Sequence, residues 1–276
     1  MSRRKWAFPV FCILVLALFA DKIQGTANKP DTQPEVVLMG DSILGQFQDE
    51  TSVAAILEDI TGKTVFNAAL GGTCMGRINR EGLAGHTKDV LDMEALATAI
   101  AIGDFGAQQT ARIRENGTEH FAGVIDGLET VDFDRVQVLF ICHGINDYHS
   151  GTPIFNPEDS LDPYTYAGAL RKSLKLLQQA YPNLQIVLVT PTFSWYPGSG
   201  YTGEEHDYGG GTLKEYVEAE ISVAEELGVE VIDVYHDFYL HDQMDDWMTY
   251  TTDGVHPNEG SRSRLAQRLA DWLDKH

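Results

Sequence analysis

The sequence predicts an α/β protein in which a parallel β-sheet lies between two layers of helices, a three-layer α/β/α sandwich. Short apolar runs rich in β-branched residues alternate along the chain with segments of helical periodicity. The run over residues 136–141 is apolar almost throughout, which is typical of a strand buried on both faces of a parallel sheet. The length suits one domain with a full core.

The N-terminal segment predicts export. Arg3, Arg4 and Lys5 form a basic start, an apolar run follows over residues 6–20, and Gly25-Thr26-Ala27 supplies small residues for cleavage. The apolar run is shorter than the roughly 20 residues that span a bilayer. We expect a signal peptide over residues 1–27 of a secreted or extracytoplasmic protein, with an uncleaved anchor as the alternative, and a single domain over residues 28–276.

The charge of the chain limits its partners. The formal net charge is −21 at pH 7, which disfavours contact with nucleic acid and with anionic lipid. The three cysteines do not make a disulfide scaffold, since Cys12 lies in the expected leader. We favour buried thiols for Cys74 and Cys142 over a bridge between them, and their spacing does not suit zinc.

The expected strands and helices follow one another in the order that a parallel sheet requires. Strands are predicted over residues 35–39, 63–70, 136–141, 185–190 and 229–234. Helices are predicted over residues 43–60, 91–102 and 164–181, from a capping box at Thr212 to Gly228, and at the C-terminus. Residues 193–211 are expected to form a loop rich in glycine and aromatic residues.

Gly40-Asp41-Ser42 directly follows the first predicted strand. Ligands of open α/β sheets bind at the carboxyl ends of the strands, so a serine there is accessible to a substrate. The expected helix N-terminus also favours developing negative charge. Taken alone, the same triplet also suits a turn that merely caps a helix.

Asp253-Gly254-Val255-His256 supplies a candidate base. A serine hydroxyl becomes a strong nucleophile only when a neighbouring imidazole takes its proton. A carboxylate on the other ring nitrogen holds that imidazole in the required tautomer, and an aspartate three residues earlier can provide it locally. An isolated Asp-x-x-His is also compatible with a loop that only caps the last helix.

Two further loops could bind an oxyanion. Asn67 is followed by Gly71-Gly72 after the second strand, and Gly144-Ile145-Asn146 follows the third. A glycine lets a backbone N–H approach a substrate closely, and an asparagine can donate from its side chain. Each loop on its own is also an ordinary turn. Asp41 and Asp147 are expected to steady their own turns.

Together these four blocks, in this order and at strand ends, resemble the SGNH hydrolases, also called the GDSL family. The resemblance covers the chain from Glu35 to its end. It implies a flavodoxin-like sheet of five parallel strands in the order 2-1-3-4-5, and no metal or organic cofactor. Ile43 stands where the family name has leucine, a swap of similar bulk.

The resemblance also implies roles for individual residues. Ser42 matches the nucleophile, and its backbone N–H the first oxyanion donor. The further donors are Gly72, with Gly71 as the alternative, and Asn146. His256 matches the base and Asp253 the acid that orients it.

We expect a serine esterase that hydrolyses short O-acyl esters, such as acetyl esters, of a small molecule or carbohydrate. Tyr148, Trp195 and Tyr196 are candidates for substrate contact, with simple packing as the alternative. A lipase or lysophospholipase and an O-acyltransferase of the same fold remain alternatives, and a non-catalytic carbohydrate-binding module is the alternative outside enzymes. No nucleic-acid partner is expected, and no membrane contact beyond an N-terminal anchor.

Overall fold

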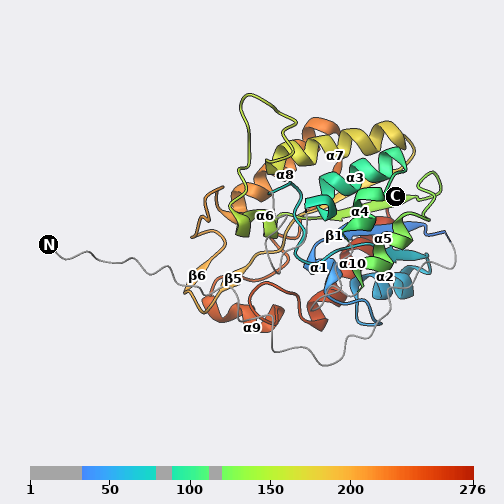
Figure 1. The fold of residues 1–276 in the computed structure, drawn as a ribbon. Helices are drawn as coiled ribbons and strands as arrows, with labels where there is room; N and C mark the ends of the chain where they lie inside the picture. Colours follow the sequence, from blue (N-terminus) through green and yellow to red (C-terminus); the bar gives the residue numbers. More distant parts are fainter. Residues whose placement is uncertain (1–32, 79–88, 112–119) are drawn as a thin grey trace.

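A computed structural model describes residues 33–78, 89–111 and 120–276 (Figure 1). The expected leader over residues 1–27 lies outside them. A five-stranded sheet forms the centre, in the order β2-β1-β3-β4-β7 with every neighbouring pair parallel. Its strands are β1 (Val36–Gly40), β2 (Val65–Asn67), β3 (Val138–Cys142), β4 (Gln185–Val189) and β7 (Glu230–Ile232). The expected order 2-1-3-4-5 is therefore confirmed.

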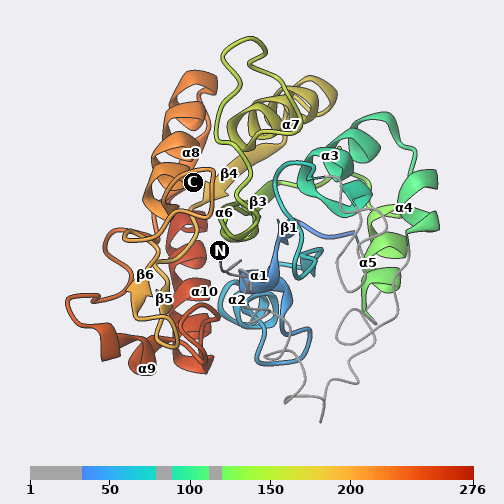
Figure 2. The same ribbon diagram turned by 60° about the vertical axis from the view of Figure 1, so that its left-hand side comes forward.

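Helices cover both faces of this sheet (Figures 1 and 2). One layer holds α2 (Val53–Thr61) and α10 (Glu259–Leu273), which pack against each other. The other holds α3 (Met93–Ile102), α7 (Tyr166–Ala180) and α8 (Leu213–Leu227), in which α7 contacts both neighbours. The three-layer α/β/α sandwich is confirmed.

The other helices of the described residues are shorter. They are α1 (Ser42–Gly45), η1 (Asp89–Leu91), α4 (Gly106–Thr110), α5 (Phe121–Leu128), α6 (Ile145–Ser150), η2 (Met244–Asp246) and α9 (Trp247–Tyr250). Within the described ranges, no helix is both long and apolar enough to cross a membrane.

The strands β1 and β3 are neighbours in the sheet, so the motifs that follow them, at Ser42 and at Asn146, come close together. Every residue of β1 and β3 is buried, as their apolar runs predict. At their carboxyl ends Gly40 pairs with Cys142. A Cβ on Gly40 would lie only 2.6 Å from the Cys142 carbonyl oxygen, so this close approach requires glycine. Cys142 and Cys74 are not joined by a disulfide and both are buried, which confirms the expectation of two buried thiols.

Side chains fix the helix ends as the sequence suggests. Thr212 and Glu215 form the expected capping box of α8, and Gly228 ends that helix with φ +65°. Thr165 accepts a hydrogen bond from the Gly168 N–H at the start of α7. These local hydrogen bonds therefore set where the two helices begin and where α8 ends.

The helix expected over residues 43–60 is wrong, because the chain breaks between α1 and α2. The Asn67 side chain donates to the carbonyls of Leu44 and Phe47, where a continuing helix would use them itself. Arg262 of α10 donates in the same way to the Thr51 carbonyl. Both partners lie far away in the sequence, so the local pattern does not reveal the break.

The segment expected as a loop over residues 193–211 contains a small antiparallel hairpin, β5 (Trp195–Tyr196) and β6 (Tyr201–Thr202). The hairpin and α9 lie side by side at one end of the molecule (Figures 1 and 2). This end also carries the loop between α9 and α10, which contains Asp253 and His256.

Candidate active site

Ser42 is the first residue of α1, directly after β1. Asp41 caps this short helix, because its carboxylate accepts a hydrogen bond of 2.9 Å from the Ile43 N–H. Burial raises the pKa of Asp41 to about 7, against the opposing effects of this N–H and of His256. Asp41 thus steadies the serine turn, as expected.

Hydrogen bonds connect the side chains of Ser42, His256 and Asp253 in series. We call this series the catalytic line. The Ser42 Oγ lies 2.9 Å from His256 Nε2, across 214 positions of the chain. The His256 Nδ1 lies 2.7 Å from the Asp253 Oδ2. A hydrogen on Nδ1, bound to the carboxylate, leaves Nε2 as an acceptor for the serine proton.

The loop that carries the histidine is closed on itself. The Asp253 Oδ1 accepts the backbone N–H groups of Val255 and His256, and Thr251 pairs with Pro257 across the loop. Burial alone would raise the pKa of Asp253, but the hydrogen bonds and charge of His256 lower it to about 2. Asp253 is therefore a carboxylate at neutral pH.

The glycine loop after β2 lies against the serine. A Cβ on Gly71 would be 3.5 Å from the Cβ of Ser42, which is ordinary contact distance. Gly72 has φ +77°, a left-handed conformation that favours glycine. The loop therefore packs against the serine at Gly71.

Asn146 lies in α6, immediately after β3, and joins this loop from the other side. Its Nδ2 donates a hydrogen bond of 3.0 Å to the carbonyl of Thr73. An amide nitrogen carries two hydrogens, and the Asn146 side chain also interacts with the Asp41 carboxyl, whose pKa it lowers. The two expected oxyanion loops are thus connected through one side chain.

Asp147 does more than steady its own turn, which corrects the expectation. The side chain is fully buried, and its two oxygens accept the N–H groups of Met75 at 2.8 Å and Gly76 at 3.0 Å. It therefore fixes the end of the glycine loop from the α6 side. The adjacency of Asp147 to Asn146 is the one feature of the sequence that points to this role.

Two of the three candidates for substrate contact are buried instead. Trp195 and Tyr148 are both 0% exposed: Trp195 packs against Tyr239, and the Tyr148 hydroxyl donates to the His206 carbonyl. Neither ring can stack on a sugar without a rearrangement. Tyr196, the third candidate, is only half-buried.

Tyr196 meets His149, one turn after Asn146 on α6. The Tyr196 hydroxyl lies 2.6 Å from the His149 Nε2. Burial, and then the charge of His256, lowers the pKa of His149 to about 4. Burial also raises the pKa of Tyr196 well above its usual range. Both groups are therefore neutral at pH 7. His149 lies close enough to His256 and Asp253 to interact with both electrostatically.

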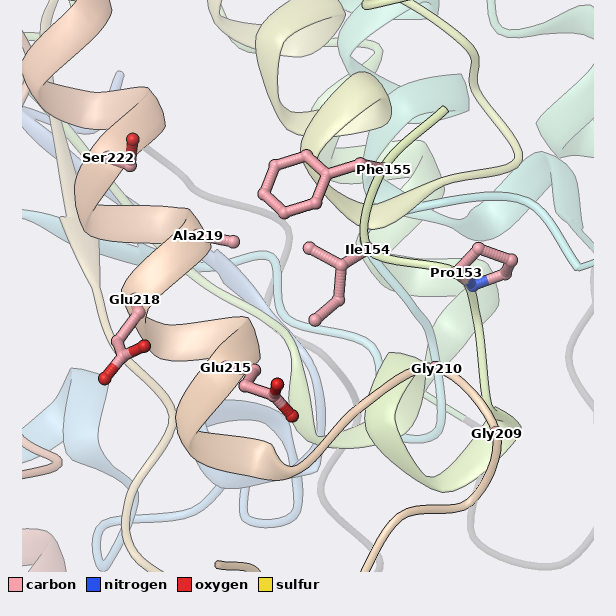
Figure 3. A pocket seen from close by; sticks show the side chains of 9 residues that line it. All are labelled: Pro153, Ile154, Phe155, Gly209, Gly210, Glu215, Glu218, Ala219 and Ser222. Atoms are coloured by element: carbon pink, nitrogen blue, oxygen red, sulfur yellow. The ribbon is translucent and has the colours of Figure 1, made fainter. Parts of the chain in front are cut away.

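A separate hollow of about 610 Å³ lies between α8 and the chain after α6 (Figure 3). Phe155 and Ile154 project toward Ala219 of α8, and Gly209 and Gly210 close one side. Neither Ser42 nor His256 lines it. Within the described residues, no cluster of three or more His, Cys, Asp or Glu side chains is arranged to hold a metal ion.

Solved structures share this fold at low sequence identity. A possible lipase from Chitinophaga pinensis is 18% identical, with a TM-score of 0.56, covering 87% of this chain and 97% of that one. A carbohydrate acetylesterase from Sinorhizobium meliloti is 15% identical, with a TM-score of 0.52, covering 88% and 99%. A family two carbohydrate esterase from Clostridium thermocellum, in complex with cellohexaose, is 15% identical, with a TM-score of 0.51, covering 88% and 65%.

No curated protein sequence matches the chain. The model of the GDSL-like lipase/acylhydrolase family does match, over residues 38–260. The match includes Ser42, both oxyanion loops and the Asp253–His256 pair, and it spans most of the chain. The chain therefore belongs to the GDSL-like lipase/acylhydrolase family and is a hydrolase of ester bonds.

Proposed function

We propose that this protein is a serine esterase that removes short O-acyl groups, such as acetyl, from carbohydrate through an acyl-enzyme on Ser42. The observation that carries the proposal is the line from Ser42 Oγ to His256 Nε2, 2.9 Å, and from His256 Nδ1 to Asp253, 2.7 Å. These distances let one proton pass from the serine to the imidazole while the carboxylate stabilises the resulting imidazolium.

In the first half of the reaction, His256 Nε2 takes the Ser42 proton as Oγ attacks the ester carbonyl carbon. The carbonyl oxygen becomes an anion. The backbone N–H groups of Ser42 and Gly72 and the side-chain amide of Asn146 are the proposed donors to it. The anion then collapses, the bond to the alcohol oxygen breaks, and His256 gives its proton to the leaving alcohol.

In the second half, a water molecule takes the place of the alcohol. His256 removes a proton from this water, whose oxygen attacks the acyl carbon bound to Ser42. The same donors hold the second oxyanion. Its collapse releases the carboxylic acid, and His256 returns the proton to Ser42 Oγ, so the enzyme regains its starting state.

A carbohydrate ester is favoured by several observations. Carbohydrate esterases are among the proteins of the same fold. The formal net charge of −21 disfavours a surface of anionic lipid. His149 and Tyr196 supply neutral polar groups beside the catalytic line, which suits a hydroxylated leaving group. An exported enzyme, as the leader over residues 1–27 predicts, would meet such polymers outside the cell.

Labelling tests the nucleophile. A fluorophosphonate probe should modify the wild type at Ser42, and Ser42→Ala should not be labelled. Ser222→Ala, which removes an exposed serine of α8, serves as the matched control and should label normally. Continued labelling of folded Ser42→Ala would assign the nucleophile elsewhere.

Turnover tests the substrate class. We expect p-nitrophenyl acetate or butyrate to be hydrolysed fastest in a series of rising acyl length, and acetylated polysaccharide to release acetate. An optimum at long acyl chains would instead support a lipase. Transfer of the acetyl group to an added sugar, in place of acetate release, would support an acyltransferase.

A further inference from the structure

Glu220 is a buried carboxyl group outside the catalytic line. It lies in the middle of α8 and is only 2% exposed. Its Oε2 lies 2.8 Å from the hydroxyl of Tyr166, the first residue of α7, which is fully buried. The same hydroxyl lies 3.3 Å from the backbone carbonyl oxygen of His143.

The hydrogens in this group can be counted. A tyrosine hydroxyl has one hydrogen to donate, and a backbone carbonyl can only accept. If Glu220 were ionised, it too could only accept, and one of the two contacts of Tyr166 would lack a hydrogen. A protonated Glu220 donates to Tyr166, which then donates to His143, so both contacts are satisfied.

The surroundings of Glu220 also favour the neutral form. Burial raises its pKa well above the usual range, and nearby acids raise it further while the Tyr166 hydrogen bond opposes them. Among the ion pairs of the described residues, none includes Glu220. The titratable groups that interact with it come from five elements or their ends: Asp41, Cys142, Asp147, Tyr166 and Asp233.

Glu94 provides the opposite case within the same chain. Its side chain is also fully buried, but it pairs with Lys172 at 2.7 Å and with Arg77. Two cations therefore compensate the burial of Glu94. Glu220 has no such partner among the ion pairs of the described residues.

The hydrogen bonds that run from Glu220 through the Tyr166 hydroxyl to the His143 carbonyl form a relay. This relay ends at the turn that presents Asn146. His143 precedes Gly144, whose φ of +132° starts α6. A Cβ on Gly144 would lie 3.1 Å from the Tyr166 hydroxyl oxygen, so this hydroxyl is packed directly against the turn. Whatever fixes Tyr166 therefore also fixes the backbone that aims the Asn146 side chain.

We propose that Glu220 is protonated in the folded enzyme, and that the relay from Glu220 through Tyr166 to the His143 carbonyl holds the turn carrying Asn146. Glu220 is then a positioning residue for oxyanion binding. The protonation state stands on the hydrogen count and the surroundings alone. The catalytic consequence rests on the proposed function of Asn146.

Two matched variants test the protonation state. Glu220→Gln keeps a donor for Tyr166 and should leave the melting temperature at pH 7 equal or higher. Glu94→Gln should lower it, because Arg77 and Lys172 lose their partner. Above a pH of about 4.5 the unfolded chain releases the Glu220 proton and the folded chain keeps it, so the wild type loses stability as the pH rises. The advantage of Glu220→Gln should therefore grow from pH 5 to pH 8. A lower melting temperature for Glu220→Gln at all these pH values would overturn the proposal.

Kinetics test the positioning function. Tyr166→Phe breaks the relay but keeps the packing, so kcat on p-nitrophenyl acetate should fall about tenfold or more, with KM nearly unchanged. Glu220→Gln should retain kcat and should lack any alkaline loss that ionisation of Glu220 causes in the wild type. A wild-type kcat for Tyr166→Phe would overturn the positioning function. If Asn146→Ala is also fully active, the proposed function fails instead, while the stability comparison still decides the protonation state.

Discussion

Asp253 and Asp233 hold the histidines three residues further along the chain in the same way. In each pair a carboxylate oxygen lies 2.7 Å from the histidine Nδ1. The other oxygen accepts the backbone N–H groups two and three residues on, at 2.9 and 2.8 Å for Asp253 and at 2.9 and 3.1 Å for Asp233. The difference lies beyond the ring: His256 reaches the Ser42 hydroxyl, whereas the His236 side chain is 47% exposed.

The first prediction uses this duplication as its control. Asp253→Asn should lower kcat on p-nitrophenyl acetate by roughly 10³–10⁴-fold, because an amide no longer enforces the tautomer that accepts the serine proton. Asp233→Asn removes an equivalent set of local hydrogen bonds and should leave kcat unchanged. Steady-state kinetics and thermal melting of both variants check this. Equal losses of kcat would mean that the local turn, and not the contact with Ser42, sets activity.

The second prediction concerns oxyanion binding. Asn146→Ala should reduce kcat about 10²–10³-fold with little change in KM, since the donor acts mainly on the transition state. Asn156→Ala is the control, because it removes an asparagine side chain whose amide bonds to Asp162 instead. A change in KM alone for Asn146→Ala would place this residue in ground-state binding.

The third prediction concerns how the hairpin positions the histidine loop. The Trp195 N–H donates to the Gly254 carbonyl at 2.8 Å, and Gly254 has φ +98°. A Cβ there would lie 2.3 Å from the Trp195 carbonyl oxygen, so Gly254→Ala must shift the loop between Asp253 and His256. Both the melting temperature and kcat should fall.

Gly62→Ala is the matched control for that prediction. Gly62 also has a positive φ, +68°, but a Cβ there meets nothing within 4 Å. It should cost only about 1–2 kcal/mol for the left-handed backbone and leave kcat unchanged. Retention of wild-type kcat by Gly254→Ala would show that the loop is not held by the hairpin.

The sequence was informative wherever short-range chemistry decides the structure. The apolar runs of β1 and β3, the capping box of α8 and the turn of Asp253 all depend on neighbouring residues. The order of the strands came instead from the family resemblance. The hydrophobic periodicity could not have predicted this order, because it carries no information about which strands pair.

Features that depend on distant partners escaped prediction. The end of α1 is set by Asn67, and the burial of Trp195 follows from its packing against Tyr239 and Tyr250. Asp147 holds a loop 71 and 72 positions earlier in the chain. The pattern around each residue is equally compatible with a surface position, so only the folded arrangement distinguishes the alternatives.

The last prediction follows from the buried imidazole of His149, whose pKa of about 4 results first from burial. When the pH falls below about 6.5, the unfolded chain binds a proton that folded His149 does not. The wild type should therefore lose stability between pH 6.5 and pH 4, with this group adding a slope of up to about 1.4 kcal/mol per pH unit. Melting temperatures measured across this range check it.

His149→Gln removes the titrating ring and should show a shallower acid loss than the wild type. Tyr196→Phe removes the 2.6 Å hydrogen bond to His149 but keeps an aromatic ring in edge-to-face contact with it, so it should keep most of the wild-type slope. Parallel curves for the wild type and His149→Gln would mean that the pKa of His149 does not change on folding, so that the folded protein also protonates this ring as the pH falls below about 6.5. A second cation beside His256 would then oppose the imidazolium that the proposed reaction forms, so this measurement also bears on the catalytic line.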